Sequence, residues 1–490
     1  MAKKTPVSDS APISDSPESK ATPIPRKAKT PAPTDAGHAH SDDLIVSISG
    51  VRGIAGTALN PAAVVSYVDA FARLVKGSRI VVGHDARPSS KWIVPIVEGV
   101  LRSLGVDVVF VGMVATPTVG LLVRKLKLAG GIAITASHNP LPYNGLKFFH
   151  SGGEFITSEM LGQLKRLHAD PTLDRPARGI GKRAHFTDSA EVHLQALLSQ
   201  FPPPERVRAS RRPTVIIDCC NSSGAELAPD VADAYGALFQ LINSDTTKYD
   251  FPRGPEPTEA NLSALRRAVL RENADLGFGI DPDADRLAIV DEKGNAIGEE
   301  RTLVLAADAF LSMHKKKSNI VVNLSSSIAI NDVANRHGVK VFRTAIGEAN
   351  VVAGLREHRA LIGGEGNGGV IVPKVHPGRD AATGIALILM GLQSRGGTLS
   401  EWNESFPNYV MLKQSVPLQG LSVSSVLAKI KKTFAKEQID TTDGVKVTMG
   451  DRWLHVRPSN TEPIVRLFVE APTQEAAQEL VDRATALVTT

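Results

Sequence analysis

The sequence is poor in cysteine, in aromatic side chains and in long apolar runs, and each shortage excludes a class of protein. The 490 residues include two cysteines, Cys219 and Cys220, which are adjacent and so can build neither a disulfide framework nor a zinc site. We expect both to be small buried hydrophobic side chains in a reducing cytoplasm. Aromatic residues make up 5% of the chain, too few for the base-stacking surface of a nucleic-acid-binding protein.

Long hydrophobic segments are also missing. No run approaches the roughly 18 apolar residues of a transmembrane helix, and the N-terminus lacks the apolar core of a secretory signal. We therefore expect a cytoplasmic protein with no membrane partner and no nucleic-acid partner. The 56 basic and 51 acidic residues leave a formal charge of +5, a small excess that favours anionic ligands without indicating a fold.

The first 42 residues differ in composition from the rest. They are rich in Pro, Ser, Thr, Ala and Lys and show no hydrophobic periodicity, which predicts a disordered N-terminal tail. Their basic and acidic residues alternate instead of forming blocks. This favours a solvated spacer over a nucleic-acid-binding arm.

From Leu44 onward, short apolar strands alternate with amphipathic helical stretches. Such alternation is typical of α/β domains with mixed or parallel sheets. The rhythm restarts twice and then changes, which predicts three similar mixed-sheet α/β domains and a smaller C-terminal α+β domain. We expect their bounds at 43–187, 188–299, 300–408 and 409–490.

A polar turn follows the apolar run 131–134. It reads Thr135-Ala-Ser-His-Asn-Pro140, and Pro140 prevents the strand from simply continuing. A strand that ends this way presents the hydroxyl of Ser137 at the edge of the sheet. This is how a nucleophile is presented, so Ser137 is a candidate nucleophile. An ordinary connection is the alternative, because Ser, Asn and Pro all favour turns.

Three aspartates alternate in Asp281-Pro-Asp-Ala-Asp-Arg286. In an extended segment, Asp281, Asp283 and Asp285 point to one side, and converging carboxylates indicate Mg²⁺. An EF-hand loop begins similarly, but Arg286 stands where that loop needs glycine and a strand follows. An acidic turn without a metal remains an alternative.

Two further loops carry groups suited to a sugar phosphate. Arg457-Pro-Ser-Asn-Thr-Glu-Pro463, with Arg466 beyond it, offers guanidinium, hydroxyl and backbone donors for a phosphate, although a plain solvent turn explains it as well. Gly363-Gly-Glu-Gly-Asn-Gly-Gly369 offers Glu365 and Asn367 to sugar hydroxyls and lacks the spacing of a nucleotide-binding loop. Arg52, Arg87 and Lys147 lie in the domain of Ser137, and individually they read as ordinary surface charges.

In this order, the segments resemble the α-D-phosphohexomutase family, which includes phosphoglucomutases, phosphomannomutases and phosphoglucosamine mutases. The resemblance spans Leu44 to the C-terminus. It implies four domains around one cleft, and a phosphoserine that exchanges its phosphoryl group with a hexose monophosphate through a 1,6-bisphosphate. It also implies one Mg²⁺ per chain, a hexose 1,6-bisphosphate primer, and a monomer or homodimer.

The resemblance assigns roles residue by residue. Its catalytic residues are Ser137, His138, Lys147, Arg52 and Arg286, and its metal ligands are Ser137, Asp281, Asp283 and Asp285. Its substrate-binding residues are Glu365, Asn367, Arg457, Ser459, Asn460, Thr461 and Arg466. Lys147 is the expected general acid/base, which requires a lowered pKa, while His138 is expected to orient the reacting groups.

Two departures from the family pattern bear on the substrate. The sugar loop commonly reads Gly-Glu-x-Ser-Gly-His, whereas Asn367 and Gly369 stand in place of the serine and histidine here. This resembles the archaeal-type phosphoglucosamine mutases and favours glucosamine phosphate over mannose or glucose phosphate. Pro282 and Ala284 replace common glycines without changing a metal ligand. A non-catalytic sugar-phosphate-binding protein and a phosphatase are the alternative hypotheses.

Overall fold

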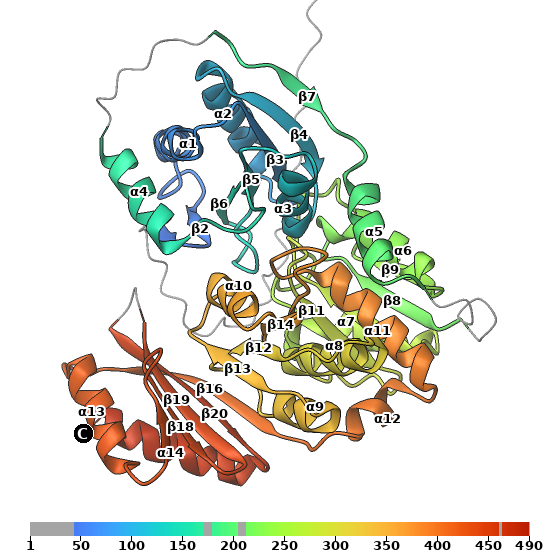
Figure 1. Cartoon of the computed structure of the whole chain (residues 1–490), viewed down its shortest axis with the longest axis vertical. Helices are drawn as coiled ribbons and strands as arrows, with labels where there is room; N and C mark the ends of the chain where they lie inside the picture. Colours follow the sequence, from blue (N-terminus) through green and yellow to red (C-terminus); the bar gives the residue numbers. More distant parts are fainter. Residues whose placement is uncertain (1–43, 171–178, 204–211, 460–462, 490) are drawn as a thin grey trace, which may run out of the picture. The chain divides into compact units, whose positions relative to one another are not determined.

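The computed structural model describes residues 44–170, 179–203, 212–459 and 463–489. The predicted tail and the loop residues Asn460 and Thr461 lie outside these ranges. Among the described residues there are four separate sheets, which confirms the predicted architecture (Figure 1). No helix in the described ranges has the length and apolar character needed to cross a membrane.

The first sheet is mixed and has seven strands in the order β1-β2-β6-β5-β3-β4-β7. Its strands are β1 (Ile45–Ser47), β2 (Gly50–Ile54), β3 (Arg79–His84), β4 (Asp107–Met113), β5 (Gly130–Ile134), β6 (Tyr143–His150) and β7 (Arg183–His185). Its helices are α1 (Pro61–Val75), α2 (Ser90–Ser103), α3 (Thr116–Lys125) and α4 (Ser158–Ala169). Ile80 and Val82 belong to one core and Val81 to another, because successive side chains of a strand point to opposite faces. Helices therefore cover both faces of this sheet.

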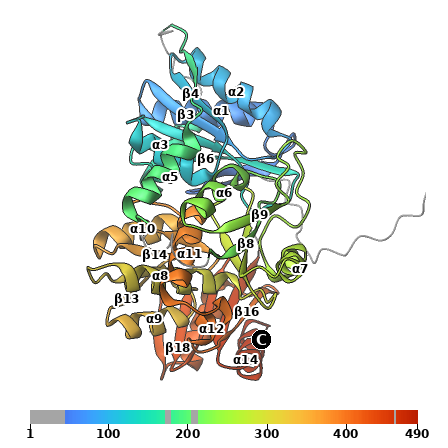
Figure 2. The same cartoon turned by 90° about the vertical axis from the view of Figure 1, so that its right-hand side faces the viewer.

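The second and third sheets have four strands each. The second has the order β11-β10-β8-β9, and the third β13-β12-β14-β15. The second unit contains α5 (Ser189–Gln200), β8 (Thr214–Asp218), α6 (Gly224–Ala234), β9 (Leu238–Ile242), η2 (Glu259–Leu262), α7 (Ser263–Arg271), β10 (Leu276–Ile280) and β11 (Leu287–Asp291). The third contains α8 (Glu299–Met313), β12 (Ile320–Asn323), α9 (Ala329–His337), β13 (Val341–Thr344), α10 (Glu348–Glu357), β14 (Ile362–Glu365), β15 (Gly369–Ile371), α11 (Ala381–Arg395) and α12 (Leu399–Glu404). Figure 2 shows α5 beside α6 and α8 beside α11.

One topology is repeated in all three sheets. In each, the first strand of the repeat pairs in parallel with the second and third, and the third pairs antiparallel with the fourth. The repeats are β3 to β6, β8 to β11 and β12 to β15. The internal duplication that the sequence rhythm predicts is therefore present in the fold, although the domain bounds themselves stay a prediction.

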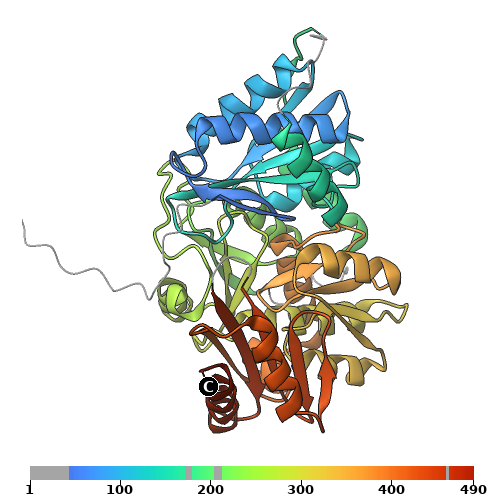
Figure 3. The ribbon, with the colours of Figure 1, turned by 90° about the vertical axis from the view of Figure 1, so that its left-hand side faces the viewer.

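The fourth sheet is antiparallel throughout, with the order β16-β20-β19-β18-β17 (Figure 3). Its elements are β16 (Val410–Pro417), α13 (Val423–Thr433), β17 (Gln438–Asp440), β18 (Val445–Met449), β19 (Arg452–Pro458), β20 (Ile464–Ala471) and α14 (Gln474–Thr489). A separate core of Val, Leu and Ile side chains joins the sheet to its two helices. This is the smaller α+β domain expected from the sequence.

The duplicated topology positions three of the four motifs. The serine turn joins β5 to β6, the aspartate loop joins β10 to β11, and the glycine-rich loop joins β14 to β15. Each is therefore the connection between the third and fourth strands of its repeat. The connection at this position therefore carries different functional groups in each of the three domains.

Candidate active site

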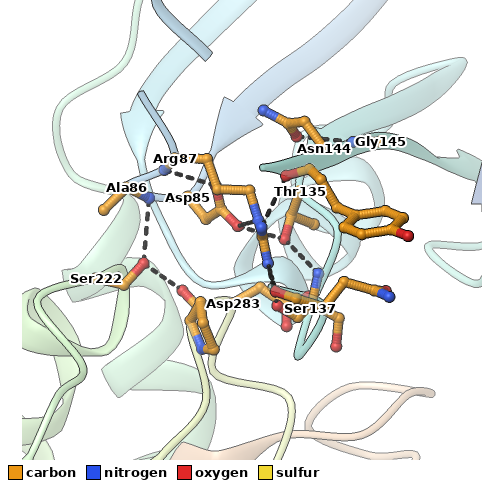
Figure 4. Close-up of polar contacts among 12 residues, drawn as sticks. Asp85, Ala86, Arg87, Thr135, Ser137, Asn144, Gly145, Ser222 and Asp283 are labelled. Carbon is orange, nitrogen blue, oxygen red and sulfur yellow. Dashed lines mark hydrogen bonds and ion pairs between the residues drawn. The ribbon is translucent and has the colours of Figure 1, made fainter. Parts of the chain in front are cut away.

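Ser137 has a backbone conformation that few residues with a side chain adopt, with φ of 52°. Its N–H donates to Thr135 Oγ1 at 2.9 Å, and Thr135 Oγ1 in turn donates to Asp85 Oδ2 at 2.6 Å. Arg87 Nη2 donates to the Ser137 carbonyl at 2.6 Å (Figure 4). These bonds hold the strained turn in place, as such conformations require. Several buried hydrogen bonds thus fix the conformation of this turn, which disfavours the alternative that it is an ordinary connection between strands.

Arg87 is the centre of this support, and the interpretation of it as a surface charge was wrong. It is fully buried, and its Nε lies 3.1 Å from Asp85 Oδ2. Its guanidinium also donates to the carbonyls of Asn139, Pro140 and Tyr143. A guanidinium offers five donors in a rigid fork, so one side chain can fix several carbonyls of a loop at once. Sequence alone gave no sign of this role.

The three aspartates of the loop 281–286 converge, but not because the segment is extended. Their carboxylate oxygens lie within 4.8 Å of one another. The loop is a turn in which Ala284 has φ of 55°, and Asp281 Oδ1 accepts the N–H groups of Asp285 and Arg286 at 3.0 and 3.1 Å. The prediction of convergence is confirmed, whereas its geometric basis was wrong: the carboxylate of Asp281 folds the backbone back on itself.

The chemistry of this loop fits a divalent cation. All three aspartates are buried, and the Oδ1 atoms of Asp283 and Asp285 have no hydrogen-bond partner among the described residues. Burial and the neighbouring carboxylates of Asp285 and Asp283 raise the pKa of Asp281 well above its usual value. Buried carboxylate oxygens without a hydrogen-bond partner suit a bound cation, and a cluster of oxygen ligands suits Mg²⁺.

The serine turn and the aspartate loop meet. Ser137 Oγ lies 3.3 Å from Asp281 Oδ2 and 3.4 Å from His138 Nδ1. Thr116, the first residue of α3, donates to Asp283 twice, from its N–H at 2.9 Å and from its hydroxyl at 2.7 Å. Hydrogen bonds from the first repeat therefore hold the aspartate loop of the second repeat next to the hydroxyl of Ser137.

Lys147 does not have the lowered pKa expected of a lysine base. Its Nζ lies 2.6 Å from Asp283 Oδ2 and 3.1 Å from Asp285 Oδ2. Burial alone would lower the pKa of Lys147, but the carboxylates of Asp283 and Asp285 outweigh it and leave the pKa raised. In this arrangement Lys147 is an ammonium group. Sequence places it in the same domain as Ser137 but cannot show how near two of the loop's carboxylates it lies.

Arg52 and Arg286 line the same cavity as Ser137. Arg52 Nη1 donates to Asn139 Oδ1 at 3.2 Å, and Arg286 Nη1 lies 2.8 Å from Glu256 Oε1. Burial, followed by the charges of Arg286 and Arg52, lowers the pKa of His138 well below its usual value. His138 is accordingly a neutral imidazole, which agrees with an orienting role.

Glu365 of the glycine-rich loop ends β14 and is held on three sides. Its Oε1 accepts from Asn323 Nδ2 and the Gly347 N–H at 2.9 and 3.0 Å, and its Oε2 lies 2.9 Å from Arg379 Nη1. Glu365 and Asn367 border a cavity of about 210 Å³. The predicted site residues that line the same cavity are Arg52, Ser137, His138, Lys147 and Arg286. The structure thus brings together seven predicted residues from the first three domains.

The fourth motif approaches this cavity from the antiparallel domain. Arg457 Nε lies 3.3 Å from Asp443 Oδ1, and Asp443 Oδ2 accepts the N–H of Ile346 at 3.0 Å. Ile346 borders the cavity. Arg457 is paired in register with Arg466, and Ser459 donates its N–H to the Ile464 carbonyl at 3.0 Å. The strands on either side of 460–462 are therefore β19 and β20, between which the phosphate loop was expected to lie, and each strand carries one of the two arginines.

Four residues of the site have no signal in a sequence motif: Thr116, Glu348, Arg379 and Asp443. Glu348 and Arg379 line the cavity, and Glu348 Oε2 lies 3.0 Å from Arg379 Nε. Burial and the Asp285 carboxylate raise the pKa of Glu348 to about 7 against the opposing charge of Arg379. In the sequence, the only signal near Arg379 is the next residue, Asp380, which is a suitable cap for the helix that follows.

Comparison with known proteins agrees with this geometry. Residues 44–172, 191–294 and 298–409 match the family models for alpha/beta/alpha domains I, II and III of phosphoglucomutase/phosphomannomutase, and residues 419–487 match the C-terminal domain. A phosphoglucomutase/phosphomannomutase of Thermococcus kodakarensis is 33% identical over 88% of this chain and 96% of its own. A probable phosphoglucosamine mutase of Methanopyrus kandleri is 33% identical over 89% of this chain and 95% of its own.

Solved structures give the same result. The crystal structure of a phosphoglucomutase/phosphomannomutase family protein from Burkholderia thailandensis is 26% identical and covers 91% of this chain and 98% of its own, with a TM-score of 0.78. The four matched domains and the loops that converge on Ser137 agree on one assignment. This chain belongs to the phosphoglucomutase/phosphomannomutase family and is a phosphohexomutase.

Proposed function

We propose that this phosphohexomutase interconverts glucosamine 6-phosphate and glucosamine 1-phosphate, with Ser137 as the residue that carries the phosphoryl group. The observation that supports this most directly is the position of the Ser137 hydroxyl. It lies 3.3 Å from Asp281 in a cavity that Arg52, Lys147 and Arg286 also line. A phosphoryl group on Ser137 would enter a site rich in fixed positive charge, where transfer is favoured by positioning and electrostatics.

The transfer requires one bond to break and one to form. In the first half, the bond between phosphorus and Ser137 Oγ breaks while phosphorus bonds to a free sugar hydroxyl, which gives a 1,6-bisphosphate. One proton leaves that hydroxyl and one proton is gained by Oγ. The side chains that can take part are His138, whose neutral imidazole lies 3.4 Å from Oγ and can accept a proton, and Lys147, whose ammonium lines the same cavity and can donate one. The bisphosphate then reorients in the cavity. In the second half, its other phosphoryl group is transferred back to Ser137 Oγ by the reverse of these changes.

The chain's own residues divide this work. Asp281, Asp283 and Asp285 are the residues that would hold Mg²⁺ together with an oxygen on Ser137, and the ion would supply positive charge to the phosphoryl oxygens. Arg52 and Arg286 would hold the same phosphoryl group with directed N–H donors. Thr116 keeps Asp283 in position through its two hydrogen bonds.

The rest of the substrate needs two kinds of contact. Glu365 and Asn367 face the cavity and can read sugar hydroxyls. The phosphate that is not being transferred would bind the loop formed by Arg457, Ser459, Asn460, Thr461 and Arg466. A separate phosphate site suits a substrate that must bind in two opposite orientations. A hexose 1,6-bisphosphate would prime the enzyme by phosphorylating Ser137.

Glucosamine phosphate is favoured over hexose phosphates without an amino group by a second carboxylate in the cavity. Glu348 and Glu365 both border it, and a protonated 2-amino group is a better partner for a carboxylate than a hydroxyl is. The name of the Methanopyrus kandleri relative agrees with this choice. Mannose or glucose phosphates are the alternative substrates. We further propose a cytoplasmic monomer or homodimer, in keeping with two free and buried cysteines.

Purified protein tests the proposal directly. It is incubated with Mg²⁺, a hexose 1,6-bisphosphate and, separately, the 6-phosphates of glucosamine, glucose and mannose. We expect isomerisation of all or some, fastest for glucosamine 6-phosphate, and a mass increase of one phosphoryl group that Ser137→Ala abolishes together with turnover. Ser199→Ala, on the exposed side of α5, is the matched control. Inorganic phosphate without an isomer would indicate a phosphatase, and binding without either product a non-catalytic protein.

A further inference from the structure

Arg379 occupies a central position in the site. Its side chain is 10% exposed and comes from the segment between β15 and α11. Three of its nitrogens each face a different carboxylate: Nη2 lies 2.7 Å from Asp285 Oδ2, Nη1 lies 2.9 Å from Glu365 Oε2, and Nε lies 3.0 Å from Glu348 Oε2. One guanidinium therefore joins the metal loop of the second repeat to the sugar loop of the third.

Space for Arg379 depends on Gly369. A Cβ atom at position 369 would lie 2.2 Å from Arg379 Cδ and 2.7 Å from Cγ, far inside van der Waals contact. Any other residue at 369 would displace the arginine or the strand β15 that carries position 369. The glycine in the place where the family commonly has histidine thus has a physical reason in this chain.

The neighbouring residue anchors this arrangement. Asp380 caps α11 by accepting the N–H of Ala382 at 3.0 Å, and its Oδ2 lies 3.1 Å from His193 Nε2 on α5. The Asp380 N–H also donates to the Val370 carbonyl at 2.9 Å, next to Gly369. Arg379 therefore extends into the site from a segment whose backbone is fixed on both sides.

We propose that Arg379 is a positioning residue that couples the metal loop to the sugar loop, and that Gly369 is the partner that admits it. This inference rests on the proposed function for its assay. The Arg379 guanidinium holds the carboxylates of both Asp285 and Glu365. It therefore fixes the orientation of Asp285 towards the metal site and that of Glu365 towards the sugar. Loss of Arg379 would release both carboxylates and would leave negative charges buried close to one another.

Arg379→Gln tests the coupling, since glutamine keeps part of the length and polarity without the charge. We expect the Mg²⁺ concentration for half-maximal activity and the KM for glucosamine 6-phosphate each to rise roughly 10- to 100-fold, the range seen when a group behind a metal ligand is removed. Arg379→Lys should restore less than half of the loss on a logarithmic scale, because lysine has a single nitrogen where the guanidinium places Nη2 on Asp285 and Nη1 on Glu365. Arg271→Gln is the control, because it makes the same change at an exposed position of α7.

Gly369→Ala gives an independent measurement. It should raise the same two constants as Arg379→Gln does. In an Arg379→Ala background, Gly369→Ala should cause no further rise, because alanine lacks the Cγ and Cδ atoms that the new Cβ would contact. Calorimetric binding of glucosamine 6-phosphate to the Mg²⁺-free protein provides a readout that does not depend on turnover, and Arg379→Gln should weaken it. Urea midpoints identify variants that fail to fold.

The outcomes separate the two proposals. If wild-type protein isomerises no sugar phosphate, the proposed function is wrong, whereas the binding measurements still test Arg379. If Arg379→Gln changes only one of the two constants, or if the Gly369→Ala penalty is unchanged in the Arg379→Ala background, the coupling role is overturned.

Discussion

Arg457 and Arg466 lie directly opposite each other on the antiparallel strands β19 and β20. Like charges in such a pair repel, and side chains at this spacing interact by a few tenths of a kcal/mol. The Asp443 carboxylate lies 3.3 Å from Arg457 Nε, but the cross-strand pairing of the two arginines does not itself favour folding. The pair is explained if the two side chains bind an anion between strands, as a phosphate site of the proposed mutase requires.

Arg466→Gln should therefore separate binding from stability. We expect the variant to bind glucosamine 6-phosphate about 10-fold or more weakly, because a charged hydrogen-bond donor contributes about 1.5–3 kcal/mol. The unliganded protein should become more stable by about 0.5 kcal/mol as the repulsion is relieved. Isothermal calorimetry measures the first effect and urea unfolding the second. Arg452→Gln, at the start of the neighbouring strand β19, is the control; weaker folding without weaker binding would contradict the role.

The turn that carries Ser137 gives a prediction about strain. Thr135→Val removes the hydroxyl that accepts the Ser137 N–H and donates to Asp85, so that a buried N–H and a buried carboxylate each lose a partner. We expect the free energy of unfolding to fall by about 2–3 kcal/mol, and kcat to fall because Ser137 is no longer held at φ of 52°.

Thr135→Ser is the matched control, since it keeps the hydroxyl and removes only a methyl group. It should retain most of the stability and most of the kcat. Equal losses in the two variants would show that packing of the methyl group, and not the hydrogen bonds to Ser137 and Asp85, supports the turn.

Sequence patterns could predict the fold class and the main chemistry because both depend on local features. Strand and helix periodicity, a polar turn after an apolar strand, and alternating aspartates are all visible within a few residues. The cap of α11 by Asp380, which accepts the Ala382 N–H, is a local feature of the same kind. The alternation of aspartates gave the correct cluster for the wrong reason, since Ala284 turns the loop with a positive φ.

Residues whose role depends on long-range contacts could not be predicted. Arg87 binds carbonyls some 50 residues away, so its burial is set by the fold and not by its neighbours in the chain. The pKa of Lys147 depends on two carboxylates of another repeat, and Arg379 joins loops that are 94 and 14 residues from it. A motif search sees none of these pairings.

His455 gives a prediction about pH. It is fully buried, its Nδ1 lies 2.8 Å from Ser325 Oγ and its Nε2 donates to the Asp443 carbonyl at 2.6 Å. Burial lowers the pKa of His455 to about 4, the Asp443 contact opposes this, and the charge of Lys446 adds to it. Since the unfolded chain takes up a proton near pH 6.5 and the folded protein only near pH 4, stability falls as the pH drops through this window.

The difference between wild type and His455→Gln isolates this effect from other titrating groups. We expect the wild type to lose up to about 3 kcal/mol more than the variant between pH 6.5 and 4, from a shift worth about 1.4 kcal/mol per pH unit. Urea unfolding at several pH values measures it. The control is His185→Gln on the exposed strand β7; identical pH slopes for wild type and His455→Gln would refute the prediction.

Glu348 gives the prediction that bears most on the substrate. Its carboxylate borders the cavity, its side chain is 9% exposed, and only its Oε2 faces Arg379 Nε. Glutamine at this position keeps the shape and removes the charge. If the carboxylate recognises a protonated amine, Glu348→Gln should lower kcat/KM for glucosamine 6-phosphate by about 10-fold or more relative to glucose 6-phosphate, since a charged hydrogen bond is roughly twice as strong as a neutral one.

The ratio of the two specificity constants is the informative quantity, because a general disturbance of the site lowers both and leaves the ratio unchanged. Glu357→Gln, at the exposed opposite end of α10, tests for effects of charge on the helix itself and should leave the ratio as in wild type. An unchanged ratio in Glu348→Gln would mean that the carboxylate serves only to hold Arg379. The preference for an amino sugar would then have to come from Glu365 or Asn367, which the same assay on Asn367→Ser examines directly.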